Sequence, residues 1–258
     1  MINMFKHIWL KELREQLYTW KGTLWLVISS LLFSLISYLL LTDKELSLLD
    51  QTEMMWMISK VIIGIGLLII SIDASSIVTN EFEKETAESL FLSPIGIKDF
   101  VSGKMFASLT LWLLIFVVSI PYIFVTSSGT KLLFPSLFYV FLLGTLGVLG
   151  FIMLIFAISL LFRSSKNTLT TSLIIILALA IPSLFPTTLK NNSFSAALGK
   201  VNPIENIFSS LDNVLVDYHA SLFQNWQFII PLMLFCLIAL MFLLYAAKNF
   251  KKAGVVKK

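Results

Sequence analysis

The uncharged run "LLFPSLFYVFLLGTLGVLGFIMLIFAISLLF", residues 132–162, decides the fold class. A helix needs about 20 apolar residues to cross the ~30 Å hydrocarbon layer of a membrane, and this run exceeds that length. Irregular backbone exposed to lipid would leave polar groups without hydrogen bonds, so the run is predicted to form a transmembrane helix. Gly144, Gly147 and Gly150 within it permit close contact with neighbouring helices.

The composition extends this prediction to the whole chain. Hydrophobic residues make up 57% of the sequence and charged residues 13%, with a mean hydropathy of +0.90, whereas about a quarter of the residues in a soluble domain are charged. We therefore expect one all-α integral membrane domain, residues 1–258, with six transmembrane helices. The predicted spans are residues 22–41, 54–78, 105–126, 132–162, 169–185 and 226–247.

The N-terminal residues 1–21 have the pattern of an amphipathic helix. Phe5, Trp9, Leu13 and Leu17 are spaced four apart, and the charged residues fall largely elsewhere around the helix. Aromatic and basic residues on such a helix favour the membrane interface. We expect an in-plane interfacial helix, and a simple anchor before the first span is compatible with the same pattern.

The distribution of basic residues predicts the orientation of the chain. An even number of spans puts both termini on one side, and Lys and Arg in the flanks and short loops mark the cytoplasmic side. The termini and the loops after the second and fourth spans hold fourteen basic residues, whereas the other three loops hold four, namely Lys44, Lys131, Lys190 and Lys200. Both termini are therefore expected in the cytoplasm. Lys60, inside the second span, is expected to snorkel towards the outer headgroups.

The net charge of +4 needs no nucleic acid to explain it. Orientation and attraction to anionic lipids account for the Lys-rich C-terminal tail, because each basic residue near a membrane surface contributes about 1 kcal/mol. We expect membrane lipids, and no nucleic acid, among the partners of the chain. On the opposite side, residues 186–225 form a long external segment whose apolar spacing predicts one or two short extracytoplasmic helices.

The loop after the second span, residues 80–98, combines acidic and apolar residues. Residues 86–92 are long enough for about two turns of helix, which Ser93-Pro94 would end. Such a short loop has no core of its own, so exposed apolar side chains on it suggest a protein partner. The alternative is a solvated loop whose apolar residues fold back onto the membrane interface.

Gly103-Lys104, at the end of this loop, invites comparison with a phosphate-binding loop. That motif needs G-x-x-x-x-G-K followed by Ser or Thr, because backbone amides must converge on the phosphates and a hydroxyl must reach Mg²⁺. Here six residues separate Gly96 from Gly103, and Met105 follows Lys104. The chain is not expected to bind ATP through these residues.

The same residues fit another pattern, because their order resembles the permease subunits of type 2 ATP-binding cassette exporters. In that family the loop after the second span carries an acidic-Gly-Thr sequence, a Leu-rich helix, a Ser-Pro turn, a basic residue and Gly-Lys. Glu85 stands where glycine is common, and Ile97, followed by Lys98, stands where arginine is common. The matching positions are Glu83, Thr86, Leu90, Phe91, Leu92, Pro94, Gly103 and Lys104.

The resemblance covers the chain in outline and implies a function. It implies a short cytoplasmic coupling helix within residues 81–97 that docks on a separate ATPase subunit, with the N-terminal helix contributing to the contact. ATP and Mg²⁺ would be bound by that partner, while this chain would bind no cofactor or metal and carry no catalytic residue. The implied coupling residues are Glu83, Glu85, Thr86, Glu88, Leu90, Phe91, Leu92, Ser93, Pro94, Gly103 and Lys104.

The resemblance also implies an assembly and a location. The partners would be ATP-binding cassette ATPase subunits together with a second copy of this permease or a homologous permease. The complex would lie in the plasma membrane of a prokaryotic cell and export its substrate. Two other functions stay open, an intramembrane enzyme and a secondary transporter that works without an ATPase; Asp73 is the one carboxylate inside a predicted span.

Overall fold

The computed structural model describes residues 2–42, 50–84, 96–128, 130–184, 199–219 and 221–255, and the regular elements in these ranges are helices. Six of the described helices, α2, α3, α5, α6, α7 and α10, are long and apolar enough to cross a membrane, as the sequence predicts. In chain order the helices are α1 (Ile2–Tyr18), α2 (Trp20–Thr42), α3 (Gln51–Glu83), α5 (Ile97–Thr126), α6 (Leu133–Phe162), α7 (Ser165–Leu184), α9 (Pro203–Leu215) and α10 (Trp226–Val255).

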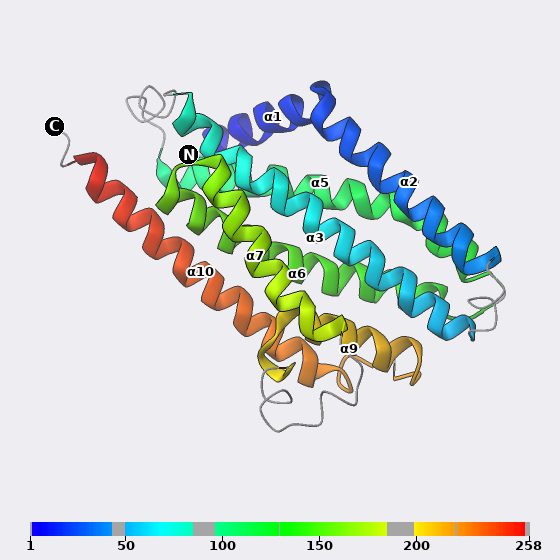
Figure 1. The fold of residues 1–258 in the computed structure, drawn as a ribbon. Helices are drawn as coiled ribbons and strands as arrows, with labels where there is room; N and C mark the ends of the chain where they lie inside the picture. The colour runs from blue at the N-terminus through cyan, green and yellow to red at the C-terminus, as the bar shows by residue number, and fades with distance from the viewer. Residues whose placement is uncertain are drawn as a thin grey trace.

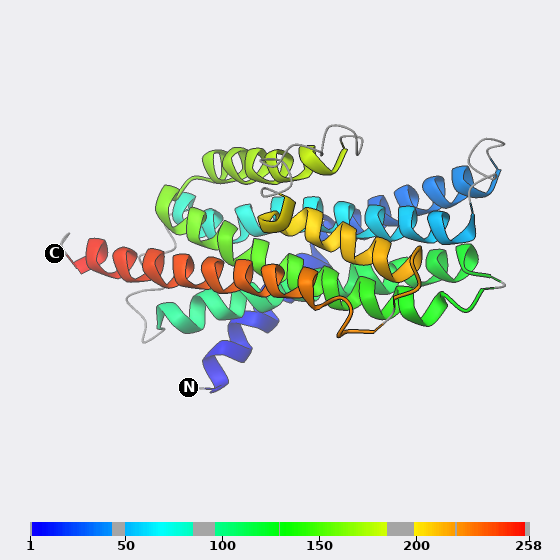
Figure 2. The ribbon, with the colours of Figure 1, turned by 90° about the horizontal axis from the view of Figure 1, so that it is seen from below.

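The long helices run side by side and give the bundle two distinct ends (Figures 1 and 2). The α1 end contains α1, the end of α3, the start of α5, the α6–α7 turn and the last part of α10. The α9 end contains α9, the start of α3 and the α5–α6 turn. Because α1 and the last turns of α10 lie at the same end, the arrangement agrees with an even number of crossings.

The core is built around α6, which contacts α3, α5, α7, α9 and α10. Lipid is as apolar as leucine, so helices in a membrane associate through close packing, and small residues permit that approach. A Cβ atom at Gly144 would meet Trp112 of α5, one at Gly147 would meet Ile207 of α9, and one at Gly150 would meet Phe235 of α10. The predicted close contacts are confirmed, and each glycine faces a different helix.

Helix α9 confirms the helical spacing predicted between residues 186 and 225. Asn202 caps its N-terminus by accepting hydrogen bonds from the backbone N–H groups of Ile204 and Glu205, and Pro203 occupies the first turn. Its inward face buries Ile207 and Leu211 among others. Other parts of this predicted segment, residues 186–198 and 220, lie outside the described residues.

Lys60 has a different environment from the one expected. Its Nζ lies over the ring of Trp56, 3.9 Å from the centroid, and 5.0 Å from the ring centroid of Phe208 on α9. Cation–π contacts of this kind hold an ammonium group within the protein. The side chain therefore packs beneath α9, a contact that the sequence pattern does not predict.

Several helices continue beyond the predicted spans. Helix α3 runs on to Glu83, α5 begins at Ile97, and α10 extends to Val255. The apolar run marks only the part that suits hydrocarbon, whereas the polar ends also satisfy their backbone hydrogen bonds best as helix. These extensions form most of the α1 end.

Candidate functional site

A buried ionic cluster joins three helices at the α1 end. The ammonium group of Lys104, on α5, donates hydrogen bonds to Glu12 Oε1 of α1 at 2.6 Å and to the backbone oxygen of Ile77 of α3 at 2.8 Å. Glu81 Oε1 of α3 lies 3.4 Å from the same nitrogen. The side chain of Lys104 is only 2% exposed, and these three acceptors match the three N–H groups of an ammonium.

One further charge, Lys11, completes what we term the Lys104 cluster, comprising Lys104, Glu12, Glu81 and Lys11. Lys11 Nζ lies 3.8 Å from Glu81 Oε1 and is half exposed, so it links the cluster to the surface. Burial raises the pKa of Glu12, while the neighbouring Lys104 acts in the opposite direction. When all four side chains are ionised the cluster is neutral, as a buried set of charges requires.

A second polar contact lies one helical turn along α1 from Glu12. Gln16 donates a hydrogen bond from Nε2 to Asp73 Oδ2 of α3 at 2.9 Å, and Ser108 of α5 donates to the same oxygen at 3.0 Å. The contact therefore joins the same three helices as the Lys104 cluster. Two donors on neighbouring helices, Gln16 and Ser108, therefore hold one carboxylate oxygen of Asp73 in place.

Gly103 provides the close approach that these contacts need. A Cβ atom at this position would lie 2.8 Å from Cγ2 of Ile8, so only glycine lets α1 pack this tightly on α5. Phe5 stacks edge to face on Phe106 with the centroids 5.2 Å apart, and Trp9 Nε1 donates to Thr110 Oγ1 at 3.2 Å. Helix α1 therefore packs on Gly103 and Lys104: the glycine leaves room for Ile8, and the lysine pairs with Glu12.

The three predicted coupling residues that the structure describes do not all lie together. Gly103 and Lys104 lie at the α1–α5 contact, whereas Glu83 lies at the start of α7. Its Oε1 accepts a hydrogen bond from the backbone N–H of Ser165 at 2.7 Å, and its Oε2 accepts one from the Ser165 hydroxyl at 3.0 Å. A carboxylate at a helix N-terminus is stabilised by the unpaired N–H groups there. The other predicted positions, Glu85, Thr86, Glu88, Leu90, Phe91, Leu92, Ser93 and Pro94, lie outside the described residues.

The predicted stripe on the N-terminal helix is also divided. Phe5 and Trp9 contact α5, and Leu13 is half-buried, but Leu17 is 39% exposed. The residues that continue the packed face are Glu12 and Gln16, both buried. They escape a search for apolar side chains, although the 4-3-4 spacing from Phe5 through Trp9 and Glu12 to Gln16 is typical of a helix seam.

The scan against protein-family models and the search of curated proteins gave no match to this chain. Among the described residues, no group of three or more His, Cys, Asp and Glu side chains is close enough to hold a metal ion. The clearest arrangement of charges in the described part of the chain is therefore the Lys104 cluster. It joins α1, α3 and α5 near the end of α3 and the start of α5.

Proposed function

We propose that this chain is the transmembrane permease subunit of an ATP-driven exporter of the type 2 ATP-binding cassette class. The Lys104 cluster carries the proposal. Glu81 and Lys104 stand on either side of the segment that resembles the coupling element of that class, and they meet each other and Glu12 inside the protein. Any force on that segment would act close to a stiff junction of three helices.

The proposed mechanism is a shift between two states of the permease. Separate ATPase subunits, which bind ATP and Mg²⁺, would close on nucleotide and press on the coupling element. The Lys104 cluster would pass this movement to α1, α3 and α5 together. To make a rare state dominant, the ATPases must favour it by several kcal/mol. A second copy of this chain, or a homologous permease, would complete the pathway.

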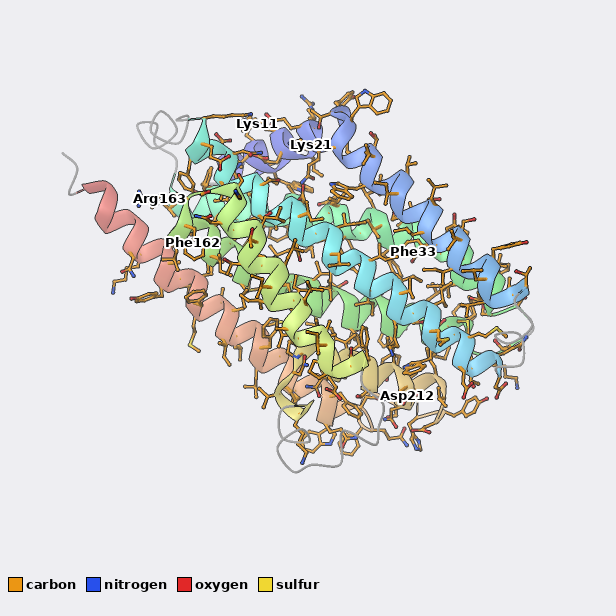
Figure 3. The ribbon with its side chains drawn as sticks, viewed as in Figure 1. Lys11, Lys21, Phe33, Phe162, Arg163 and Asp212 are labelled. Atoms are coloured by element: carbon orange, nitrogen blue, oxygen red, sulfur yellow. The ribbon has the colours of Figure 1, made fainter. Side chains whose placement is uncertain are left out.

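The charge distribution supports the direction of this arrangement. In the proposal the α1 end faces the cytoplasm, where the ATPases and their ATP are found. Lys11, Lys21 and Arg163 lie towards this end, whereas Asp212 lies at the α9 end (Figure 3). Positive charge on the cytoplasmic side is the usual pattern for membrane proteins.

The test is purification of the chain from membranes together with its ATPase. The expected result is a co-purifying protein with a true phosphate-binding loop and an ATP hydrolysis activity that the complex retains after reconstitution. Reversing two charges, Glu85→Lys with Glu88→Lys, or replacing Pro94→Ala, is expected to lower the amount of bound ATPase. Glu53→Lys, an exposed charge reversal at the α9 end, is the matched control and is expected to leave it unchanged.

Two results would overturn the proposal. One is a purified chain that carries no ATPase, and the other is an ATPase that stays equally bound in both coupling variants. A secondary transporter or an intramembrane enzyme would act without such a partner. Transport of a solute without ATP, or hydrolysis of a substrate other than ATP, by the reconstituted chain alone would therefore favour those functions.

A further inference from the structure

Helix α1 has an outer face on the side opposite its packed face. Phe5, Trp9, Glu12 and Gln16 turn towards α5 and α3, and half a turn away the side chains are exposed. The exposed residues of this outer face are Lys6, His7, Leu10, Lys11, Arg14 and Leu17. Since Glu12 and Gln16 both turn inward to partners on α5 and α3, the outer face is available for a different contact.

The outer face mixes charged and apolar side chains. His7, Leu10, Lys11, Arg14 and Glu15 lie around one open region of the helix surface. Three of these residues are basic or can become so, one is acidic and one is apolar. This mixture fits an occupant that is both anionic and partly apolar, because a purely aqueous face would gain nothing from an exposed leucine.

Aromatic residues mark the depth of this face in the membrane. Tyr18 is 89% exposed and Trp20 is 85% exposed, and they flank Thr19, where α1 ends and α2 begins. Tyr and Trp are enriched at the level of lipid headgroups. Figure 3 shows Lys11 on α1 and Lys21 at the start of α2, so basic side chains lie on both sides of the break.

We propose that the outer face of α1 binds the headgroup of an anionic phospholipid. Lys11 and Arg14 meet the phosphate, and the guanidinium of Arg14 suits it because its paired N–H groups match two phosphate oxygens. Leu10 and Leu17 face the upper part of the acyl chains. Lys6, Lys11, Arg14 and Lys21 outnumber Glu15, so the face as a whole attracts negative charge. The inference does not rest on the proposed transport function, but the two share Lys11, which also lies 3.7 Å from Glu15 and 3.8 Å from Glu81 of the Lys104 cluster.

Native mass spectrometry of the purified full-length chain tests this inference. The chain is titrated with phosphatidylglycerol and, separately, with zwitterionic phosphatidylcholine of the same chain length. We expect the wild type to retain phosphatidylglycerol in preference. Lys11→Gln with Arg14→Gln is expected to weaken phosphatidylglycerol binding roughly ten- to thirty-fold, since each surface charge contributes independently, and to leave phosphatidylcholine binding unchanged.

The matched control removes two charges from the other end of the bundle. Lys131→Gln with Lys200→Gln, both exposed positions near the α9 end, is expected to retain the wild-type preference. Equal retention of both lipids by the wild type would overturn the inference, as would wild-type lipid binding by the Lys11/Arg14 variant. If Arg14→Gln alone, which lies outside the Lys104 cluster, loses a bound ATPase while keeping the wild-type lipid preference, the outer face serves a protein and the inference is wrong.

Discussion

Lys104 shows how a charged residue can be stable at the base of a membrane bundle. Removing an ion from water costs several kcal/mol, and only good geometry with further hydrogen bonds recovers that cost. Here the ammonium has a carboxylate at 2.6 Å, a backbone oxygen at 2.8 Å and a second carboxylate at 3.4 Å. The pair adds little net stability over an apolar pair, but it strongly penalises any state in which α1 leaves α5.

The replacement Lys104→Ala is therefore expected to destabilise the protein by about 3–5 kcal/mol, because it leaves Glu12 buried without its cation. The thermal unfolding midpoint in detergent measures the loss. Lys98→Ala, an exposed lysine on the first turn of α5, is the matched control and is expected to change stability by less than about 0.5 kcal/mol. Combining Lys104→Met with Glu12→Gln should recover most of the stability. A double variant as unstable as Lys104→Ala would show that the two residues are not coupled.

The protonation of Glu12 gives this site a pH dependence. Burial raises its pKa above the ordinary value of 4.5, so the folded protein holds the proton more tightly than the unfolded chain. The resulting stabilisation is complete below pH 4.5 and is lost as the pH rises through the raised pKa. Glu12→Gln imitates the protonated form and removes this dependence.

Relative to Glu12→Gln, the wild type is expected to lose stability as the pH rises from about 4 to about 8. The quantity to measure is the difference between the two unfolding midpoints across this range, because carboxyl groups far from Glu12 titrate equally in both proteins. A difference that stays constant with pH would contradict the raised pKa of Glu12.

At the scale of helices, α1 shows what the sequence could and could not predict. The spacing of its apolar residues is enough to predict that α1 forms and that it is amphipathic. Its packed face does not follow from that spacing, because Glu12 and Gln16 are polar and their partners Lys104 and Asp73 are far away in the sequence. Burial of a charge depends on a partner supplied by the tertiary fold, and no local pattern contains that information.

The apolar spans are predictable for the opposite reason. A membrane imposes one length and one composition on every crossing, so the six runs are visible without knowledge of their neighbours. Which helix contacts which is less visible. The glycines of α6 predict close contacts between helices. Only the structure shows that Gly144 faces Trp112 of α5 and that Gly147 faces Ile207 of α9.

The ring of Trp112 on α5 fills the space left by two glycines, Gly66 of α3 and Gly144 of α6. Its buried ring lies between α3 and α6, where a Cβ atom at Gly66 would be 2.2 Å from the ring and one at Gly144 would be 2.4 Å from it. Its Nε1 donates to Thr145 Oγ1 at 3.1 Å, which fixes the orientation of the ring. The ring cannot retreat without losing this hydrogen bond.

Gly66→Ala is expected to destabilise the bundle by about 1–3 kcal/mol through overpacking. Gly64→Ala, two residues earlier on α3, is the matched control, because a Cβ atom there has nothing within 4 Å. It is expected to be neutral or to stabilise by up to about 1 kcal/mol through helix propensity. Unfolding midpoints of the two variants, and of Gly66→Ala combined with Trp112→Phe, provide the comparison. Equal effects at both glycines would exclude the proposed ring contact.

For the whole molecule, the charge distribution and the two ends of the bundle combine into a prediction of orientation. The termini and two of the loops carry fourteen of the basic residues, and the helices bring these segments to the α1 end (Figure 1). Insertion of the chain with so many basic residues on the outer side would oppose the usual preference for Lys and Arg in the cytoplasm. It would also lose the attraction between these residues and the anionic lipids of the inner leaflet. The α1 end is thus expected in the cytoplasm.

Cysteine labelling measures this orientation directly. With Cys236→Ser as background, Lys131→Cys in the α5–α6 turn and Lys166→Cys at the start of α7 introduce single exposed thiols at opposite ends. A membrane-impermeant maleimide added to intact cells is expected to label Lys131→Cys at once and Lys166→Cys only after permeabilisation, because only the α9 end faces outwards. The two positions are both exposed lysines, so accessibility does not favour either. The reverse pattern would place the Lys104 cluster outside the cell, where no ATPase could act on it, and the proposed function would fail with the orientation.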